Sequence, residues 1–316
     1  MASIMRETMW RQPTDLRRLL ADPDPAEAAA ERLRGRRVFL VGTGTSWHAA
    51  NHGVWLLREA GVDALPVQAM DAALWGPRPG PDDALLLLSH RNSKRFASVE
   101  LARARAAGVP TVVISGAGSE GADLETVEQE RSPTFTASHL GALLRLAQLA
   151  RALGAALPGL ERIPEAVEFA LSGDGPRVQA PAKALEYIGA GPNQWTAAEG
   201  ALKVREAALV IAQGLSVEQF FHGPAVACGE GCTLVCLDGG GPGAERIEAV
   251  AAAAEATGSV VHRISETALG EPLSVFALTV AIQRIALDLA EELGTDPDAF
   301  GYNVPGRKEA WGALQL

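Results

Sequence analysis

The segment VGTGTSWHAANHGVWLLREAG, which starts at Val41, decides the fold because the chain repeats it. IGAGPNQWTAAEGALKVREAA, which starts at Ile188, aligns with it without a gap at an offset of 147 positions. Glycines, alanines, an arginine and a glutamate recur in register, and further along Gly76-Pro77 aligns with Gly223-Pro224. Glycines and a Gly-Pro step in constant register rarely arise by chance, so we expect two copies of one structural unit.

Each copy alternates short apolar strands with amphipathic helices. The strands expected in the first copy are RRVFLVG, ALLLLS and TVVIS, and those in the second are LEYIGAG, CTLVCL and SVVHRIS. Unbroken apolar runs such as 84–89 and 232–237 are typical of parallel strands covered on both faces. Each copy ends in a long helix, at about 136–154 and about 273–294. This alternation predicts an α/β fold in which each copy is a parallel-sheet, three-layer αβα sandwich.

The repeat also predicts the domain boundaries. We expect a first domain at residues 1–157, led by an amphipathic helix, and a second domain at residues 158–316, which ends in a tail. The segment 158–179 is expected to join the two domains.

Composition narrows the function classes. The net charge of −10 with no basic block argues against a nucleic-acid groove or an anionic membrane surface as the main partner. We find no run that is long enough to span a membrane and no signal peptide, so we expect a cytoplasmic protein. An odd count of three cysteines argues against a disulfide framework. Cys232 and Cys236 lie in an apolar strand, where cysteine acts as a small apolar residue, and no metal site is expected.

The Gly-x-Gly turn after the first strand of each copy is a candidate anion site. It places backbone N–H groups at a helix N-terminus, where an anion is favoured, and Thr43, Thr45 and Ser46 add hydroxyl donors. A dinucleotide fingerprint is the competing interpretation, but its third glycine would fall at Trp47 or Gln194. We therefore expect no nicotinamide and no other cofactor.

The loop Ser89-His90-Arg91-Asn92-Ser93-Lys94-Arg95 is a second candidate. Its cations are able to neutralise a phosphate or a carboxylate. Alternatively, they are solvated charges at the start of a helix. Cations at a helix N-terminus oppose the helix dipole, so a bound anion is the favoured explanation.

The stretch AAEGALKVREAALVIAQGLSVEQFFHGPAVA resembles the isomerase domain of glucosamine-6-phosphate synthase, a member of the sugar isomerase (SIS) family. The matching motifs are Glu199-Gly-Ala-Leu-Lys203, then Glu206, then His222-Gly223-Pro224. Gly44-Thr45-Ser46 resembles the first phosphate loop of that family. The resemblance implies two tandem SIS domains. An N-terminal cysteine for glutamine hydrolysis is not found, so the expected counterparts are the shorter relatives that lack a glutaminase domain.

The resemblance implies roles for individual residues. Glu206 would be the base that shuttles a proton, His222 would open the sugar ring, Lys203 would orient the carboxylate, and Lys308 would be the lysine of the tail that forms a Schiff base. The implied substrate-binding residues are Gly44, Thr45, Ser46, Ser89, Arg91, Ser93, Lys94, Ser132 and Lys203.

The repeat supplies alternative interpretations. Glu206 aligns with Glu59, so it is also interpreted as a residue that holds a helix in both copies. His222 aligns with Trp75 while the Gly-Pro step is kept, which favours a function for the imidazole. Glu199 is expected to pair with Lys203 at i,i+4 without doing chemistry.

Two features depart from the family pattern. The second phosphate loop of the family usually reads Ser-x-Ser-Gly-Glu-Thr, and here Ser89 alone is clearly retained before a cationic sequence. Lys308 is displaced from the usual position of the tail lysine, so Arg307 and Lys308 are equally interpreted as tail charges.

The sequence therefore predicts an isomerase, or a deaminase or deglycase, that acts on a phosphorylated sugar or amino sugar through an open-chain enediol. A non-catalytic sensor of sugar phosphates is the alternative. The family also implies a homodimer in which the histidine of the His-Gly-Pro step reaches the neighbouring subunit.

Overall fold

The computed structural model describes residues 2–173, 175–312 and 314, which divide into two compact units. Unit 1 contains the N-terminal residues up to Pro13, the short segment Ser132–Thr136 and the region Gly159–Trp311. Unit 2 contains Thr14–Arg131 and Ala137–Pro158, and the described tail from Gly312 is assigned to it. Each unit therefore combines segments that lie far apart in the sequence.

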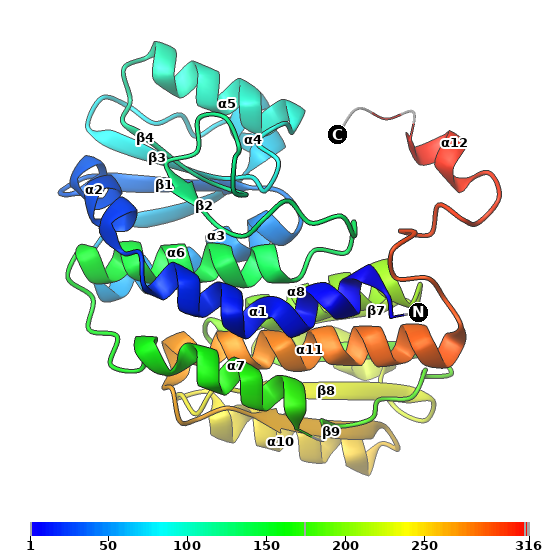
Figure 1. The fold of residues 1–316 in the computed structure, drawn as a ribbon. Coiled ribbons are helices and arrows are strands. Elements are labelled where there is room, and N and C mark those ends of the chain that lie inside the picture. Colours follow the sequence, from blue (N-terminus) through cyan, green and yellow to red (C-terminus); the bar gives the residue numbers. More distant parts are fainter. Residues whose placement is uncertain (1, 174, 313, 315–316) are drawn as a thin grey trace. The chain divides into compact units, whose positions relative to one another are not determined.

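In the described residues, unit 2 is built on a parallel sheet in the order β2-β1-β3-β4-β5 (Figure 1). The strands are β1 (Arg37–Gly42), β2 (Ala64–Gln68), β3 (Asp83–Leu88), β4 (Thr111–Ser115) and β5 (Leu124–Glu125). The helices are α2 (Asp24–Leu33), α3 (Thr45–Glu59), α4 (Ala69–Leu74), α5 (Arg95–Ala106) and α6 (Ala137–Ala152). Helix α1 (Ile4–Leu20) precedes them, and its residues up to Pro13 belong to unit 1. Strand residues such as Phe39, Leu85 and Val113 pack on α4 and α5.

Across the described part of unit 1, a second parallel sheet has the order β7-β6-β8-β9. Its strands are β6 (Ala184–Gly189), β7 (Ala212–Ser216), β8 (Cys232–Asp238) and β9 (Val260–Ser265). The helical elements are η1 (Leu160–Arg162), α7 (Ile163–Ser172), α8 (Asn193–Ala207), α9 (Val217–Phe221), η2 (Pro224–Ala227), α10 (Ala244–Ala256), α11 (Glu271–Leu293) and α12 (Arg307–Gly312). This order repeats β2-β1-β3-β4, and the predicted parallel α/β architecture is confirmed.

The two helices that follow the Gly-x-Gly turns pack against their sheets in the same way. A Cβ atom added to Gly53 on α3 would lie 2.7 Å from Leu40 Cδ2 and 2.8 Å from Leu146 Cδ2. On α8, a Cβ atom on Gly200 would lie 3.1 Å from the Tyr187 ring and 3.2 Å from Ile282 Cβ. The strand and helix partners correspond in both units. Glycine at these positions lets the helix approach its sheet closely, which explains why the repeat keeps it.

One helix requires a correction to the sequence analysis. Helix α11 is long and apolar enough to cross a membrane, whereas we expected no such run. Its most apolar window is 83% buried inside the protein, as in the core helix of a soluble protein. Its side chains, including Phe276 and Leu287, are buried.

Three local predictions have clear outcomes. The amphipathic N-terminal helix is present as α1, and Cys232 and Cys236 are buried in β8. Burial raises the pKa of the Cys236 thiol to about 12, so it stays protonated at neutral pH. The segment 158–179, which we expected only as a connection, forms η1 and α7.

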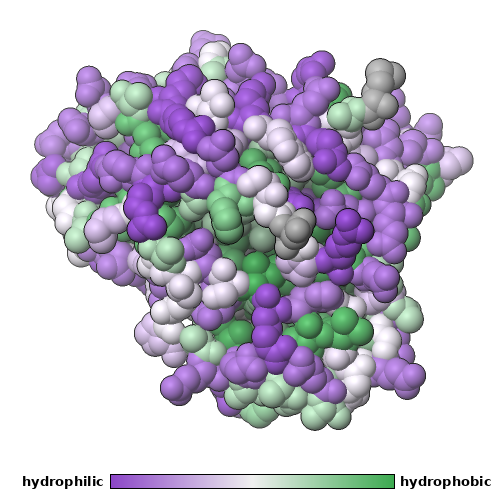
Figure 2. Space-filling view, turned by 60° about the horizontal axis from the view of Figure 1, so that its bottom comes forward, coloured by the Kyte–Doolittle hydropathy of each residue, from purple (hydrophilic) through white to green (hydrophobic). Residues whose placement is uncertain are grey.

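Apolar side chains also reach the surface. Figure 2 shows green hydrophobic residues among purple hydrophilic ones on the face turned toward the viewer. The most exposed large apolar side chains include Val226 at 91%, Phe169 at 77% and Trp75 at 72%. Val226 and Trp75 lie beside the two Gly-Pro steps.

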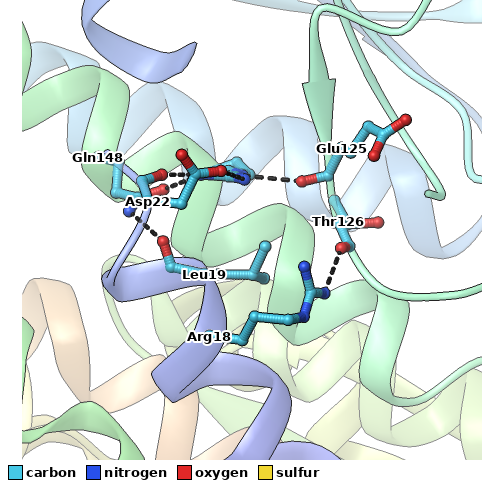
Figure 3. A network of polar contacts seen from close by, with 7 residues as sticks. Arg18, Leu19, Asp22, Glu125, Thr126 and Gln148 are labelled. Atoms are coloured by element: carbon cyan, nitrogen blue, oxygen red, sulfur yellow. Dashed lines mark hydrogen bonds and ion pairs between the residues drawn. The ribbon is translucent and has the colours of Figure 1, made fainter. Parts of the chain in front are cut away.

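A buried arginine on α6 holds peripheral segments of unit 2, and Figure 3 labels its hydrogen-bond partners Asp22, Glu125 and Gln148. Arg145 on α6 is 2% exposed, and its guanidinium donates to Glu125 O at 2.8 Å, Asp22 O at 2.6 Å and Gln148 Oε1 at 2.9 Å. Gln148 in turn donates to Leu19 O at 2.8 Å. Burial is the largest influence on the Arg145 pKa and lowers it. These bonds tie the end of α1 and strand β5 to α6.

Candidate functional site

The first Gly-x-Gly turn joins β1 to α3. A Cβ atom on Gly42 would overlap the Ser46 carbonyl oxygen and lie 2.9 Å from Trp47 N, so only glycine fits there. Gly44 has φ +58°, a conformation that favours glycine, and it precedes the first residue of α3. No side chain caps this helix and its first turn contains no acidic residue. At this helix start, Ser46 N donates to Thr43 O at 3.2 Å and Trp47 N donates to Gly44 O at 2.8 Å. Anion binding at the start of α3 stays a prediction from the helix dipole.

The loop that follows β3 leaves the sheet beside this turn. Strands β1 and β3 are neighbours, with Val41 opposite Leu87, so both segments emerge at the same edge of one sheet. Ser89 is buried, and its Oγ has no hydrogen-bond partner among the described residues. Arg91 and Ser93 are exposed, and Lys94 is partly buried directly before α5.

The cations of this loop lie close enough to influence each other. Burial is the main cause that lowers the pKa of Lys94, and the charge of Arg91 lowers it further. Two like charges at a helix start oppose each other and the helix dipole. A bound anion would relieve both effects, which supports the predicted anion site.

A set of contacts that the sequence analysis missed holds the loop in place. His90 Nε2 accepts a hydrogen bond from Glu130 N at 3.0 Å, and Ser115 Oγ donates to Ser89 O at 2.7 Å. Burial and, to a lesser degree, the Arg91 charge lower the pKa of His90 to about 4. His90 is therefore neutral at pH 7, with Nε2 as an acceptor. The Glu130 carboxylate accepts from Ser138 N at 2.7 Å at the start of α6, and no local sequence pattern signals this long-range role.

Helix α8 carries a buried charge cluster. Lys203 Nζ is paired with Glu206 Oε2, and it lies 3.4 Å from Glu199 Oε1. The side chains of Lys203 and Glu199 are fully buried, whereas that of Glu206 is 13% exposed. The expected pairing of Glu199 with Lys203 is confirmed. Glu206 is thus the member of the cluster that solvent or a ligand reaches.

Glu206 and Glu59 occupy the same position of the repeat but have different neighbours. Glu59 is exposed on α3, and the position that corresponds to Lys203 is Leu56. The interpretation of Glu206 as a common helix-holding residue therefore loses its main support. The two glutamates occupy different surroundings although they share a repeat position.

His222 lies at the surface of unit 1, at the end of α9. Its Nε2 lies 2.9 Å from Glu218 Oε1, and its side chain is 65% exposed. Glu218 also pairs with Arg246 at 2.8 Å, and this arginine is the first cause that lowers the pKa of Glu218. The side chain of Phe221 is 49% exposed and lies under the Arg246 guanidinium, 4.4 Å from ring centroid to Cζ.

The two Gly-Pro turns differ, contrary to the expected common scaffold. Gly76 has φ +84° and its peptide bond to Pro77 is cis, whereas Gly223 has φ 160° and Pro224 begins η2. The residues before the two steps also differ in backbone, with φ −83° and ψ 33° at His222 and φ −119° and ψ −18° at Trp75.

The remaining predicted residues fall in unit 1. Ser132 is fully buried, and its Oγ has no hydrogen-bond partner among the residues that the structure describes. Lys308 is exposed on α12. The structure therefore gathers part of the predicted set in unit 2 and the rest in unit 1. Unit 2 holds Gly44, Thr45, Ser46, Ser89, Arg91, Ser93 and Lys94, and unit 1 holds Ser132, Lys203, Glu206, His222 and Lys308.

Sequence comparison identifies relatives along most of the chain. The glutamine–fructose-6-phosphate aminotransferase [isomerizing] of Pyrococcus horikoshii is 27% identical over 334 aligned residues, which cover 93% of this chain and 56% of the relative. That of Thermococcus kodakarensis is 29% identical over 305 residues, covering 83% of this chain and 50% of the relative. Homologues of this chain are thus isomerizing aminotransferases. The resemblance to the isomerase domain of that family is confirmed, although no family model matches the chain. The chain spans about half the length of these relatives.

Solved structures share the fold. Glucosamine-6-phosphate deaminase of Thermotoga maritima has a TM-score of 0.78 at 19% identity, covering 94% of this chain and 97% of that one. Tagatose-6-phosphate ketose/aldose isomerase of Escherichia coli has a TM-score of 0.77 at 18% identity, covering 95% of each chain. The C-terminal domain of glucosamine-fructose-6-phosphate aminotransferase of Francisella tularensis has a TM-score of 0.77 at 16% identity, covering 94% of this chain and 98% of that one. At these identities the likeness concerns the fold.

Proposed function

We propose that this chain is an enzyme that acts on a phosphorylated sugar or amino sugar, as a ketose–aldose isomerase or as a deaminase or deglycase. The supporting observation is the Glu206 carboxylate, which is partly exposed beside a fully buried lysine in a relative of isomerizing aminotransferases. We further propose two tandem SIS domains, at 1–157 and 158–316, in a cytoplasmic protein that binds neither nucleic acid nor membranes.

Substrate binding is assigned to the groups at the edge of the unit 2 sheet. The N–H groups of the turn at 42–46 and the cations Arg91 and Lys94 bind the phosphate. Thr45, Ser46, Ser89 and Ser93 provide hydroxyl groups. Ser132 and Lys203, which the family resemblance also implies, belong to unit 1. The loop at 89–94 would bind the phosphate through the charges of Arg91 and Lys94, whereas the corresponding loop of the family uses hydroxyl groups.

The proposed chemistry moves one proton between adjacent carbons. Glu206 removes a proton from C1 of the open ketose, the C–H electrons form a C1–C2 double bond, and the carbonyl oxygen takes up a proton to give an enediol. Collapse of the enediol forms the C1 carbonyl, releases the proton of the C1 hydroxyl and returns the Glu206 proton to C2. Lys203, held between two carboxylates, fixes the position of Glu206.

Two further residues act on the ring and the carbonyl. His222 transfers the proton that accompanies ring opening. Lys308 is the proposed amine that attacks C2 of the open ketose, with loss of the carbonyl oxygen as water, to form a Schiff base. Water then hydrolyses this adduct, which restores the C2 carbonyl and frees the lysine before the proton shift described above. For an amino sugar, the proton shift gives an imine, and addition of water releases ammonia or an amine.

The panel experiment tests this function directly. Purified protein is incubated with glucosamine-6-phosphate, fructose-6-phosphate, phosphorylated sugar–amine adducts and unphosphorylated controls, while thermal shift and product formation are measured. Release of ammonia or an amine indicates a deaminase or deglycase, and aldose–ketose conversion alone indicates an isomerase. No response to any phosphosugar would show that the substrate class is wrong.

The repeat provides a matched control for the base. Glu206→Gln is expected to lower kcat by at least about 100-fold, because a general base typically contributes that much. Glu59→Gln changes the same repeat position in the other copy and is expected to leave kcat unchanged. Equal effects of the two substitutions would contradict the assigned role of Glu206.

A homodimer in which His222 serves the neighbouring copy is also proposed. The 65% exposure of the imidazole and the exposed Phe221 and Val226 support a partner at this surface. His222→Ala is expected to abolish turnover and keep ligand binding. Mixing it with Glu206→Gln would restore about a quarter of wild-type activity, because half of the random dimers have one intact pair. An active monomer in light scattering would contradict this arrangement.

A sensor of sugar phosphates is the second candidate. The cationic loop at 89–94 and the displaced position of Lys308 favour it, since both depart from the catalytic pattern of the family. Thermal stabilisation by a phosphosugar without any turnover would establish this function over the enzyme.

A further inference from the structure

The side chain of His222 ends a chain of contacts that joins α9 to α10. Glu218 lies four residues before His222, so the two side chains share one face of the helical turn. Helix α9 is capped by Ser216, whose Oγ accepts a hydrogen bond from Gln219 N at 3.2 Å. Arg246 comes from α10 and pairs with Glu218. The group therefore lies wholly within unit 1.

Arg246 holds the Glu218 carboxylate with two hydrogen bonds. Its Nε donates to Glu218 Oε2 at 2.8 Å, and its Nη2 donates to Glu218 Oε1 at 3.1 Å. A carboxylate that is bound by both arms of a guanidinium has a fixed plane. The ring of Phe221 contacts both ends of the group, because its centroid lies 4.4 Å from Arg246 Cζ and 5.4 Å from the centroid of the His222 ring. The orientation of the carboxylate is thus set by α10.

This carboxylate decides which nitrogen of His222 carries the proton. The hydrogen bond from Arg246 is the main cause that lowers the pKa of Glu218, so the carboxylate is ionised at neutral pH and acts only as an acceptor. Its Oε1 lies 2.9 Å from His222 Nε2, so Nε2 is the donor. In a neutral imidazole the other nitrogen, Nδ1, is then an acceptor. None of the described residues donates a hydrogen bond to it.

The group lies at the surface. The side chains of His222, Glu218 and Arg246 are 65%, 52% and 42% exposed. Exposed ion pairs contribute little to the stability of a fold. The consequence of this arrangement therefore lies in the orientation and the tautomer of the imidazole.

We propose that Glu218, held by Arg246, is a positioning residue for His222, and that His222 Nδ1 is the atom that exchanges the proton in ring opening. Nδ1 takes the proton of the anomeric hydroxyl, and the electrons of that O–H bond form the carbonyl. The bond between the anomeric carbon and the ring oxygen breaks, and the ring oxygen takes the proton back from Nδ1. Glu218 stays ionised and stabilises the imidazolium between the two transfers. This inference rests on the proposed function, which assigns ring opening to His222.

Nitrogen NMR of the imidazole tests the positioning without a substrate. The His222 signals are identified by their loss in His222→Ala, and spectra are recorded at a pH at which the imidazole is neutral. Wild-type protein is expected to show one tautomer with the proton on Nε2, whereas Glu218→Ala is expected to show a mixture of both tautomers. Arg246→Met should give a smaller change, because Glu218 remains but its plane is no longer fixed.

The repeat supplies a matched control. Asp71 lies five residues before the first Gly-Pro step, as Glu218 does before the second, and it is an exposed acid in the first turn of α4. Trp75 stands there in place of the histidine. Asp71→Ala is therefore expected to keep the His222 spectrum and the turnover of the wild type.

Kinetics test the consequence for the reaction. Glu218→Ala is expected to lower kcat by about 10-fold, less than the about 100-fold or more that a general acid–base group contributes, because it leaves the imidazole in place. The KM and the melting temperature should stay at their wild-type values, since Glu218 binds no phosphate and its ion pair is exposed.

Two results would overturn the inference. One is the same tautomer in Glu218→Ala as in wild type, and the other is an unchanged kcat in an active enzyme. Wild-type protein that turns over no phosphosugar of the panel overturns the proposed function, and the tautomer measurement then decides the positioning of His222 separately.

Discussion

The paired substitutions Gly42→Ala and Gly189→Ala place the same perturbation in the two copies of the repeat. In each case the new Cβ atom overlaps the carbonyl oxygen of the residue four positions later, and in each case that atom belongs to the backbone of a helix start. The helix start must move, because no side-chain rotation relieves the overlap. Overpacking of this kind costs about 1–3 kcal/mol, so both variants are expected to unfold at a lower temperature by a similar amount.

Ligand affinity separates the two variants. In Gly42→Ala, the N–H groups of the turn move away from the proposed phosphate. A hydrogen bond to a charged group contributes about 1.5–3 kcal/mol, which corresponds to a Kd about 10- to 150-fold higher. In Gly189→Ala, the displaced turn belongs to unit 1 and is not the turn proposed to bind the phosphate, so the Kd of the phosphosugar is expected to stay at its wild-type value.

The assay combines thermal unfolding with titration calorimetry on the phosphosugar that gives the largest thermal shift. Similar losses of stability with a raised Kd in Gly42→Ala alone would support the assignment of the phosphate to unit 2. If both variants raise the Kd equally, or if Gly42→Ala leaves it unchanged, the reasoning from the turn is refuted.

Three other substitutions test the buried polar groups. Arg145→Met leaves three oxygen acceptors, one in a buried and two in part-buried hydrogen bonds, without their donor and is expected to lower the free energy of unfolding by about 2–4 kcal/mol in denaturant titrations, whereas a loss below about 0.5 kcal/mol would contradict the network. Burial raises the pKa of Glu186 from 4.5 to about 7. As the pH rises from 4.5 to 7, the unfolded chain releases this proton before the folded chain does, so the free energy of unfolding is expected to fall by at most about 3 kcal/mol. Glu186→Gln should remove that pH dependence of the melting temperature, and an unchanged profile would exclude Glu186 as its source. Lys203→Met leaves the buried carboxylate of Glu199 and the partly exposed carboxylate of Glu206 without their cation and is expected to cost about 3–5 kcal/mol, while Lys203→Arg should recover part of that stability.

Part of the fold follows from local patterns. The runs at 84–89 and 232–237 are apolar without interruption, and only parallel strands covered on both faces bury such runs along their whole length. The register of the repeat at Gly42 and Gly189 predicted two equivalent turns, and their backbones agree. These predictions succeed because strand periodicity and glycine conformation depend on a few neighbouring residues.

The sequence predicted which residue types form the candidate site, but it predicted less well how buried each of their side chains is. The motif at 199–206 indicated Lys203 beside Glu206, since residues three apart share a helix face. It did not indicate that Lys203 is fully buried while Glu206 is partly exposed, because that difference arises from the elements packed on α8. The neutral state of His90 likewise depends on burial against a segment 40 residues away.

The sequence by itself determined the order of strands and helices, the two turns and the residue types of the candidate site. Only the tertiary structure decided that the Glu271 carboxylate lies against Gly191 and Gly241, that Glu59 is exposed where Glu206 is paired, and that Ser132 belongs to unit 1. The physical reason is the range of the forces involved. Backbone preferences and apolar periodicity act over a few residues, whereas the surroundings of a side chain depend on groups that packing brings together from distant parts of the chain.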